Sequence, residues 1–106
     1  MRAVFKGIPI LVVAMAGLNG SLAVAANADQ GATLAKRWCA TCHVVDGNQK
    51  QASADVPPFA VIAKKTDFSP DKLAAFLMEP HPQMPNFTLS RSEAADIAAF
   101  IGTLRK

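Results

Sequence analysis

The stretch Cys39-Ala40-Thr41-Cys42-His43 determines how the rest of the chain is interpreted. It has the pattern Cys-x-x-Cys-His, which is the attachment motif for c-type haem. Two thiols two residues apart, on one helical turn, can each add to a vinyl group of the porphyrin and form a thioether bond. The imidazole of His43 then lies beneath the ring, where it can bind the iron. The motif therefore predicts one covalent haem c, attached through Cys39 and Cys42 and ligated by His43.

Three other interpretations of the motif are open. A thioredoxin-like redox pair needs a neighbouring βαβ pattern, and the sequence shows no convincing strand pair. A structural zinc site needs about four ligands, for which Cys39, Cys42, His43 and His81 would have to serve, although His43 adjoins Cys42 awkwardly for joint chelation. A plain disulfide between the two cysteines is compatible with an exported protein. We favour haem attachment.

The first 28 residues have the features of a secretory signal peptide. Arg2 and Lys6 give a positive start, an apolar run follows over 8–18, and small residues then offer cleavage after Ala25 or after Ala28. The alternative is a retained membrane anchor, for which the apolar run is short, because a membrane span needs about 20 residues. We therefore expect an exported, periplasmic protein whose mature form has no stable membrane span.

Charge and size limit the functions open to the mature chain. The 106 residues carry a net charge of +3, but without Arg2 and Lys6 nine basic and eight acidic residues remain. No dense basic run is present, which argues against nucleic-acid binding. A domain of this size is near the lower limit for a self-sufficient core. We expect a bound haem to supply the missing apolar centre, and the haem-free chain to be largely unfolded.

Beyond the motif, the chain resembles the class I cytochrome c family over most of its length after about residue 29. In that family a glycine eight residues before the first cysteine lets the last helix cross closely, and Gly31 has this offset. A family proline offers its carbonyl to the ligand histidine, and Pro57 is the first choice for it, with Pro58 the second. The resemblance implies that 29–106 is one all-α cytochrome c domain, with three to four short helices around the haem.

Start signals and apolar stripes at helical spacing predict where the helices lie. The expected ranges are 29–43, about 57–65, 69–79 and about 91–104, with starts marked by Asp29, Pro57, Ser69 and the capping box of Ser90 and Glu93. The expected inward faces are Leu34, Ala35, Trp38 and Cys42; Phe59, Ile62 and Ala63; Leu73, Phe76 and Leu77; and Ala94, Ile97, Ala98, Ile101 and Leu104, with Phe100 beside them. The polar stretch 49–55 is expected to be a surface loop.

The second axial ligand is less directly specified than the first. Met84 is followed by Pro85 in a proline-rich loop before the last helix, and the resemblance implies that this methionine binds the iron. His81 lies on the same loop and binds iron well when neutral. Met78 lies on the third predicted helix, where core filling is its simpler role. An open or water-filled position is the remaining alternative.

Ligation by His43 and Met84 would give a closed, six-coordinate, low-spin iron, which favours electron transfer over catalysis. We therefore expect a monomeric, periplasmic one-electron carrier that docks briefly with redox enzymes. The alternatives are a docked electron-transfer subunit of an oxidoreductase complex, and a haem sensor or peroxidase with a labile sixth ligand. Trp38, directly before the motif, is either a packing residue or an aromatic docking contact.

Overall fold

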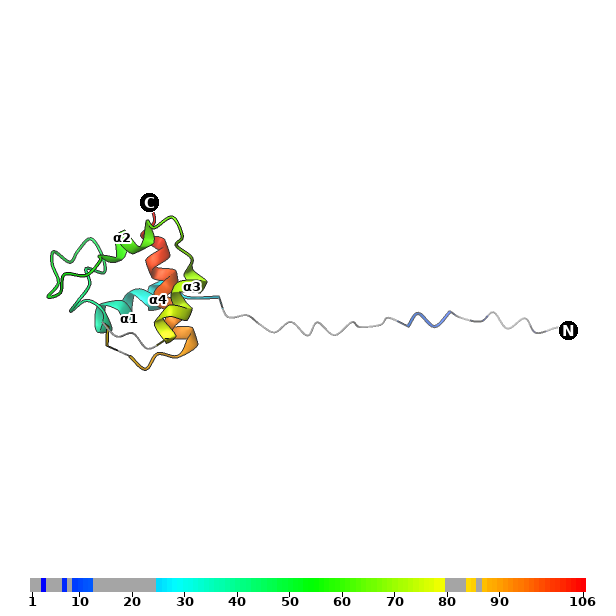
Figure 1. Ribbon diagram of the computed structural model, residues 1–106. Coiled ribbons are helices and arrows are strands. Elements are labelled where there is room, and N and C mark those ends of the chain that lie inside the picture. Colours follow the sequence, from blue (N-terminus) through cyan, green and yellow to red (C-terminus); the bar gives the residue numbers. More distant parts are fainter. Residues whose placement is uncertain (1–2, 4–6, 8, 13–24, 80–83, 86) are drawn as a thin grey trace.

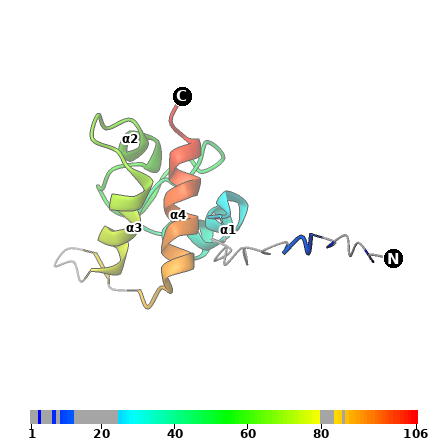
Figure 2. The ribbon, with the colours of Figure 1, turned by 90° about the vertical axis from the view of Figure 1, so that its right-hand side faces the viewer.

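The computed structural model describes residues 3, 7, 9–12, 25–79, 84–85 and 87–106 (Figure 1). Across these residues the regular structure is entirely helical, with α1 (Ala28–Trp38), α2 (Phe59–Ala63), α3 (Pro70–Met78) and α4 (Arg91–Thr103). Helix α4 contacts each of the other three, and Figure 2 shows it between α1 and α3. The predicted all-α fold is confirmed. No helix in the described part of the chain is long and apolar enough to cross a membrane.

The core forms where the apolar stripe of α4 meets α1 and α2. The helix buries the stripe residues Ala94, Ile97, Ala98 and Ile101, as the helical spacing predicts, and Phe100 beside them. Three of them, Ile97, Phe100 and Ile101, form one cluster with Leu34 and Ala35 of α1, Phe59 and Ala63 of α2, and Val45 from the connection between these helices. The core is nevertheless small, since its largest fully buried side chains are Ile97, Ile101 and Val45.

Helices α1 and α4 approach most closely at Gly31. A β-carbon added to this glycine would overlap the main-chain carbonyl of Asp96 and approach the backbone nitrogen of Ile97. The same crossing is tied at its edge, because the Asn27 N–H donates to a carboxylate oxygen of Asp96 at 2.7 Å. The expected close crossing at Gly31 is therefore confirmed. The backbones of the two helices are in contact there, because the glycine has no side chain.

Replacing Gly31 by alanine is expected to destabilise the folded protein by about 1–3 kcal/mol, since the helices must separate to admit the methyl group. For a domain of this size, each kcal/mol corresponds to a fall in Tm of about 4–8 °C. Gly102→Ala is the matched control, because its added carbon would lie 3.6 Å from the Phe68 ring, an ordinary contact. Thermal unfolding of the two variants should differ accordingly. Equal melting temperatures would mean that the crossing is not close.

The starts of α3 and α4 agree with the predicted capping signals, whereas those of α1 and α2 differ. Helix α2 begins at Phe59 with Pro58 as its N-cap, and not at Pro57 as predicted. Ser69 caps α3 through the Lys72 N–H, and Ser90 and Glu93 form the expected capping box on α4. Hydrogen bonds from Ser90 lower the pKa of the Glu93 carboxyl group. The bond from the backbone N–H has the larger effect, and the bond from the hydroxyl has the smaller one. The prediction of Asp29 as the cap of α1 is wrong. Asn27 caps this helix by accepting from the Gln30 N–H at 3.0 Å, and Asp29 lies in the first turn.

Two helices end earlier than predicted. Helix α1 stops at Trp38, because the N–H groups of Cys39 and Ala40 both donate to the Ala35 carbonyl, at 2.8 and 3.1 Å, so the regular bonding pattern is lost. The attachment motif therefore lies in turns after the helix. Helix α2 ends at Ala63. The next two N–H groups, of Lys64 and Lys65, each donate to the carbonyl three residues earlier, which is the pattern of a 3₁₀ turn.

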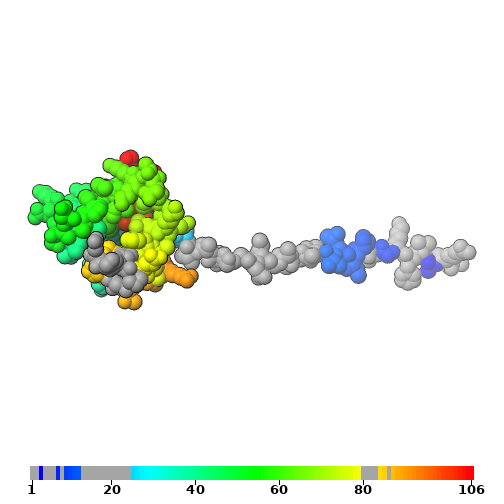
Figure 3. All heavy atoms as spheres, viewed as in Figure 1, coloured from blue at the N-terminus to red at the C-terminus, as the bar shows by residue number. Residues whose placement is uncertain are grey.

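Helix α3 differs most from the predicted packing. None of its residues is buried, and Figure 3 shows the helix at the surface of the domain. Leu73 and Leu77 pack partly against the core, as expected, but Phe76 is 53% exposed. Met78 is 43% exposed, so the interpretation of this methionine as core filling is wrong. Two large apolar side chains of α3, Phe76 and Met78, are thus partly exposed to solvent.

Candidate haem site

The turn after α1 presents the two thiols and the imidazole of the motif. The N–H groups of Cys42 and His43 both donate to the Cys39 carbonyl, at 3.1 and 2.8 Å, so the three side chains come from a single turn. Both cysteines are free and half-buried. Both thiols are thus free and lie on one turn, as haem attachment requires.

The chemistry of the thiols separates the interpretations of the motif. Burial, together with the neighbouring Cys42, raises the pKa of the Cys39 thiol to about 11. Redox-active pairs of the thioredoxin kind instead need a lowered thiol pKa, so this thiol is protonated where they are ionised. In the described part of the chain, no three His, Cys, Asp or Glu side chains gather as a metal site.

The orientation of His43 is set by a backbone carbonyl from across the loop. Its Nδ1 lies 2.7 Å from the carbonyl oxygen of Pro57, as the first of the two predicted choices requires. A carbonyl only accepts, so Nδ1 carries the proton and Nε2 keeps a free lone pair. The Phe59 N–H donates to the Val44 carbonyl at 2.9 Å, which joins this proline segment to the chain after the motif. The ring of Phe59 also packs at 5.2 Å from the imidazole.

Met84 lies in the connection between α3 and α4 and is half-buried. This connection returns to the end of α1, because the rings of Trp38 and Phe87 lie 5.8 Å apart. Trp38 immediately precedes Cys39, and Phe87 follows Met84 by three residues. The loop that carries the methionine is therefore packed against the start of the motif. His81, the rival ligand, lies outside the described residues.

Trp38 has the first of the two roles expected for it. Its contact with Phe87 makes it a packing residue between α1 and the methionine loop. It also remains 41% exposed, and the Arg37 guanidinium lies 5.0 Å from its ring centre, within the range of a cation–π contact. Its use as a docking contact stays a prediction.

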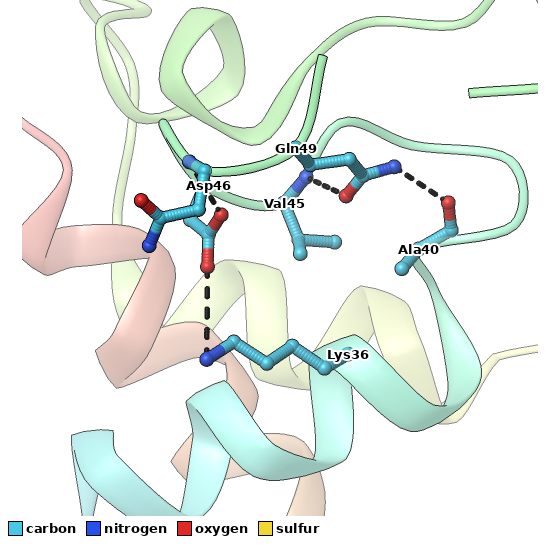
Figure 4. A pocket seen from close by; sticks show the side chains of 6 residues that line it. Lys36, Ala40, Val45, Asp46 and Gln49 are labelled. Atoms are coloured by element: carbon cyan, nitrogen blue, oxygen red, sulfur yellow. Dashed lines mark hydrogen bonds and ion pairs between the residues drawn. The ribbon is translucent and has the colours of Figure 1, made fainter. Parts of the chain in front are cut away.

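Gln49 is a site residue that the sequence pattern did not indicate. It was expected in a surface loop, but its side chain hydrogen-bonds the backbone of the motif and of the residues after it. In Figure 4 Gln49 and Asp46 both lie above Lys36 of α1, and Asp46 and Lys36 form an ion pair at 3.8 Å. These residues line a surface pocket with Ala40, Val45 and Asn48. A polar residue between turn signals has no feature in sequence that distinguishes it from an ordinary loop residue.

The residues present fit a haem. Two free thiols at the motif spacing can form the thioethers, and the free Nε2 of His43 can bind iron because Nδ1 is committed to Pro57. Apolar side chains of α3 are exposed, and the protein core is small. A flat apolar cofactor would supply the buried apolar area that a domain of this size lacks. The described residues thus include the atoms that would bind the haem and apolar side chains that it could cover.

Comparison with known proteins agrees with this chemistry. The family model described as cytochrome c oxidase, cbb3-type, subunit III matches residues 26–101. The chain therefore belongs to this family of cytochrome c domains, and as a monohaem c-type cytochrome it carries one covalent haem c.

A curated relative shows the role of the chain more closely. The chain is 62% identical over 95 residues to cytochrome c-552 of Bradyrhizobium diazoefficiens, a match that covers 90% of each protein. It is accordingly an electron carrier and not an enzyme. No solved structure matches the chain.

Proposed function

We propose that this cytochrome shuttles single electrons in the periplasm, with its haem attached to Cys39 and Cys42 and its iron held between His43 and Met84. The observation that carries this proposal is the 2.7 Å contact of His43 Nδ1 with the Pro57 carbonyl. A carbonyl in this place selects the tautomer whose Nε2 can bind iron. The half-buried thioether of Met84, on a loop packed against the motif, supports the second assignment.

The chain's own residues account for rapid and reversible electron transfer. When bound, the haem supplies an iron that changes its charge by one unit. The hydrogen bond to Pro57 keeps the His43 ring in one orientation and strengthens Nε2 as a donor in both oxidation states. Bound to the iron, the thioether of Met84 would be a soft ligand that favours the reduced state and would leave no place for water. If both ligands stay bound, little would have to reorganise when an electron moves.

The test of carriage is a redox titration of the purified haem-loaded protein, combined with exposure to carbon monoxide. We expect a single one-electron transition and no rapid binding of carbon monoxide by the reduced protein. Rapid carbon monoxide binding would favour the sensor or peroxidase alternative, since it needs a vacant or labile sixth position. A transition of more than one electron would contradict a single haem.

Export would follow from a signal peptide over residues 1–28, and the capping of α1 distinguishes the two cleavage sites. Asn27 caps α1 through the Gln30 N–H and is bonded to Asp96 through its own N–H. Cleavage after Ala28 would remove this residue, and losing an N-cap costs about 1 kcal/mol. Cleavage after Ala25 would keep it.

We therefore expect mature protein from the periplasm to begin at Ala26. Sequencing of its N-terminus, or the intact mass of the holoprotein, checks this. A mature protein that begins at Asp29 would show that α1 does without its cap. A retained segment 1–25 would support the membrane-anchor alternative instead.

The second candidate function is that of a docked subunit, which the description of the family favours because it names a subunit of cbb3-type cytochrome c oxidase. Size-exclusion chromatography of detergent-treated membranes separates the two. A free carrier elutes alone and a docked subunit elutes with a larger haem protein.

A further inference from the structure

The side-chain amide of Gln49 lies against the backbone of residues 40–45, which include most of the attachment motif. Its Nε2 donates to the carbonyls of Ala40 at 2.7 Å and His43 at 2.9 Å, and its Oε1 accepts from the Val45 N–H at 3.0 Å. Figure 4 shows the bonds to Ala40 and Val45. The partners determine the orientation of the amide, because the carbonyls need a donor and the Val45 N–H needs an acceptor.

These bonds join three places in the haem-binding segment. Ala40 lies between the two cysteines, His43 ends the motif, and Val45 is a fully buried core residue. Gln49 therefore links the motif backbone to the hydrophobic core through one side chain. Nε2 also approaches the Gln51 carbonyl at 3.1 Å, so its two protons are shared among three acceptors.

Gln49 is itself held in place by a turn next to α1. The Asp46 carboxylate accepts from the Asn48 N–H at 2.9 Å, which closes an Asx turn, and the Gln49 N–H donates to the Asp46 carbonyl at 3.3 Å. The other carboxylate oxygen of Asp46 pairs with Lys36 of α1. The Lys36 side chain is largely exposed, so this ion pair adds little and the turn does most of the positioning.

His43 is thus restrained twice, from opposite ends of the residue. Pro57 holds the imidazole through Nδ1, and Gln49 holds the main-chain carbonyl. The direction in which Nε2 points depends on both the ring torsions and the position of the backbone. We propose that Gln49 is a positioning residue for the axial histidine, which fixes the backbone of the attachment motif so that the imidazole meets the iron in one orientation. This inference depends on His43 being the axial ligand, as proposed above.

The test compares isosteric variants of Gln49 with the same changes at Gln51. Gln49→Glu keeps the length and the acceptor for Val45 but points a carboxylate oxygen at the three carbonyl oxygens that Nε2 contacts. Gln49→Met removes both hydrogen-bonding functions. Gln51→Glu and Gln51→Met are matched controls, because the Gln51 side chain is exposed and makes no hydrogen bond with the residues that the structure describes. The readout is the pattern of haem-methyl proton shifts in the ferric holoprotein, which reports the orientation of the axial imidazole.

We expect both Gln49 variants to change the spread of these shifts, the glutamate more than the methionine, and both Gln51 variants to keep the wild-type pattern. Gln49 variants that melt at lower temperature with an unchanged pattern would overturn the proposal, because Gln49 would then only stabilise the loop. A wild-type protein whose ferric spectrum shows no histidine ligation would instead sink the proposed function, before any variant is compared.

A second measurement needs no variant. In the wild-type holoprotein we expect the side-chain amide protons of Gln49 to exchange with solvent at least about tenfold more slowly than those of Gln51, because three partners protect them. Should neither Gln49 variant accumulate with haem, this rate decides the matter. Exchange as fast as that of Gln51 would overturn the proposal, and slow exchange supports it.

Discussion

Replacing Met84 by histidine is expected to lower the reduction potential by roughly 0.2–0.4 V, a part of the roughly 0.8 V range that axial ligands set in haem proteins. The physical reason is that imidazole lacks the preference of a thioether for ferrous iron. For a one-electron couple about 59 mV corresponds to a factor of ten, so the change is several orders of magnitude in relative ligand affinity. Spectroelectrochemical titration of the holoprotein measures it directly.

Met78→Leu is the matched control for this variant. Met78 lies on α3 and is 43% exposed, and the exchange of methionine for leucine conserves volume. Its potential should stay close to that of the wild type. If Met84→His left the potential unchanged while Met78→Leu lowered it, the axial assignment would pass to Met78. If neither changed it, His81 would become the leading candidate.

Replacing both Cys39 and Cys42 by alanine is expected to abolish covalent haem and, with it, cooperative folding. The fully buried side chains are few and small, and a domain near the lower size limit cannot offset its conformational entropy without added apolar area. Intact mass and circular dichroism of the product provide the two readouts. The variant should lack the added mass of haem and should unfold without a sharp transition.

The control for this variant lies inside the motif. Thr41→Ala alters an exposed side chain and leaves both thiols in place, so this variant should load haem and fold as the wild type does. A double cysteine variant that retained covalent haem would show that attachment uses another residue. A haem-free chain with a sharp, native-like unfolding transition would show that the protein core suffices without the cofactor.

Much of the fold follows from local rules of physical chemistry. The spacing of apolar residues in α4 predicts its buried face, and the serine caps of α3 and α4 are confirmed because the hydroxyl-to-backbone bond is local. The close contact at Gly31 and the Pro57 carbonyl were expected from the resemblance to the cytochrome c family and not from local rules, and the structure shows both.

The remaining features depend on contacts between distant segments. Asn27 replaces Asp29 as the cap because its backbone is also bonded to Asp96, 69 residues away. Helix α1 ends before the motif because two N–H groups compete for one carbonyl, which no residue type signals. The role of Gln49 arises from the path of the chain around it, and a glutamine in a polar loop does not reveal that path.

The exposure of Phe76 has a different origin. Helical periodicity identifies which side of α3 is apolar, but it does not say what covers that side. In the described structure α4 and its neighbours cover only part of it, through Leu73 and Leu77. A pattern in sequence cannot separate burial against protein from burial against a cofactor.

The most direct test of the proposed iron ligation by His43 and Met84 is a proton NMR spectrum of the ferrous holoprotein. With Met84 bound opposite His43, its methyl group lies close over the porphyrin, whose ring current shifts the signal far upfield. We predict one such three-proton signal, retained in Met78→Leu and lost in Met84→Leu. A ferrous wild-type protein without this signal, or a signal that disappears with Met78 instead, would contradict an iron held between His43 and Met84.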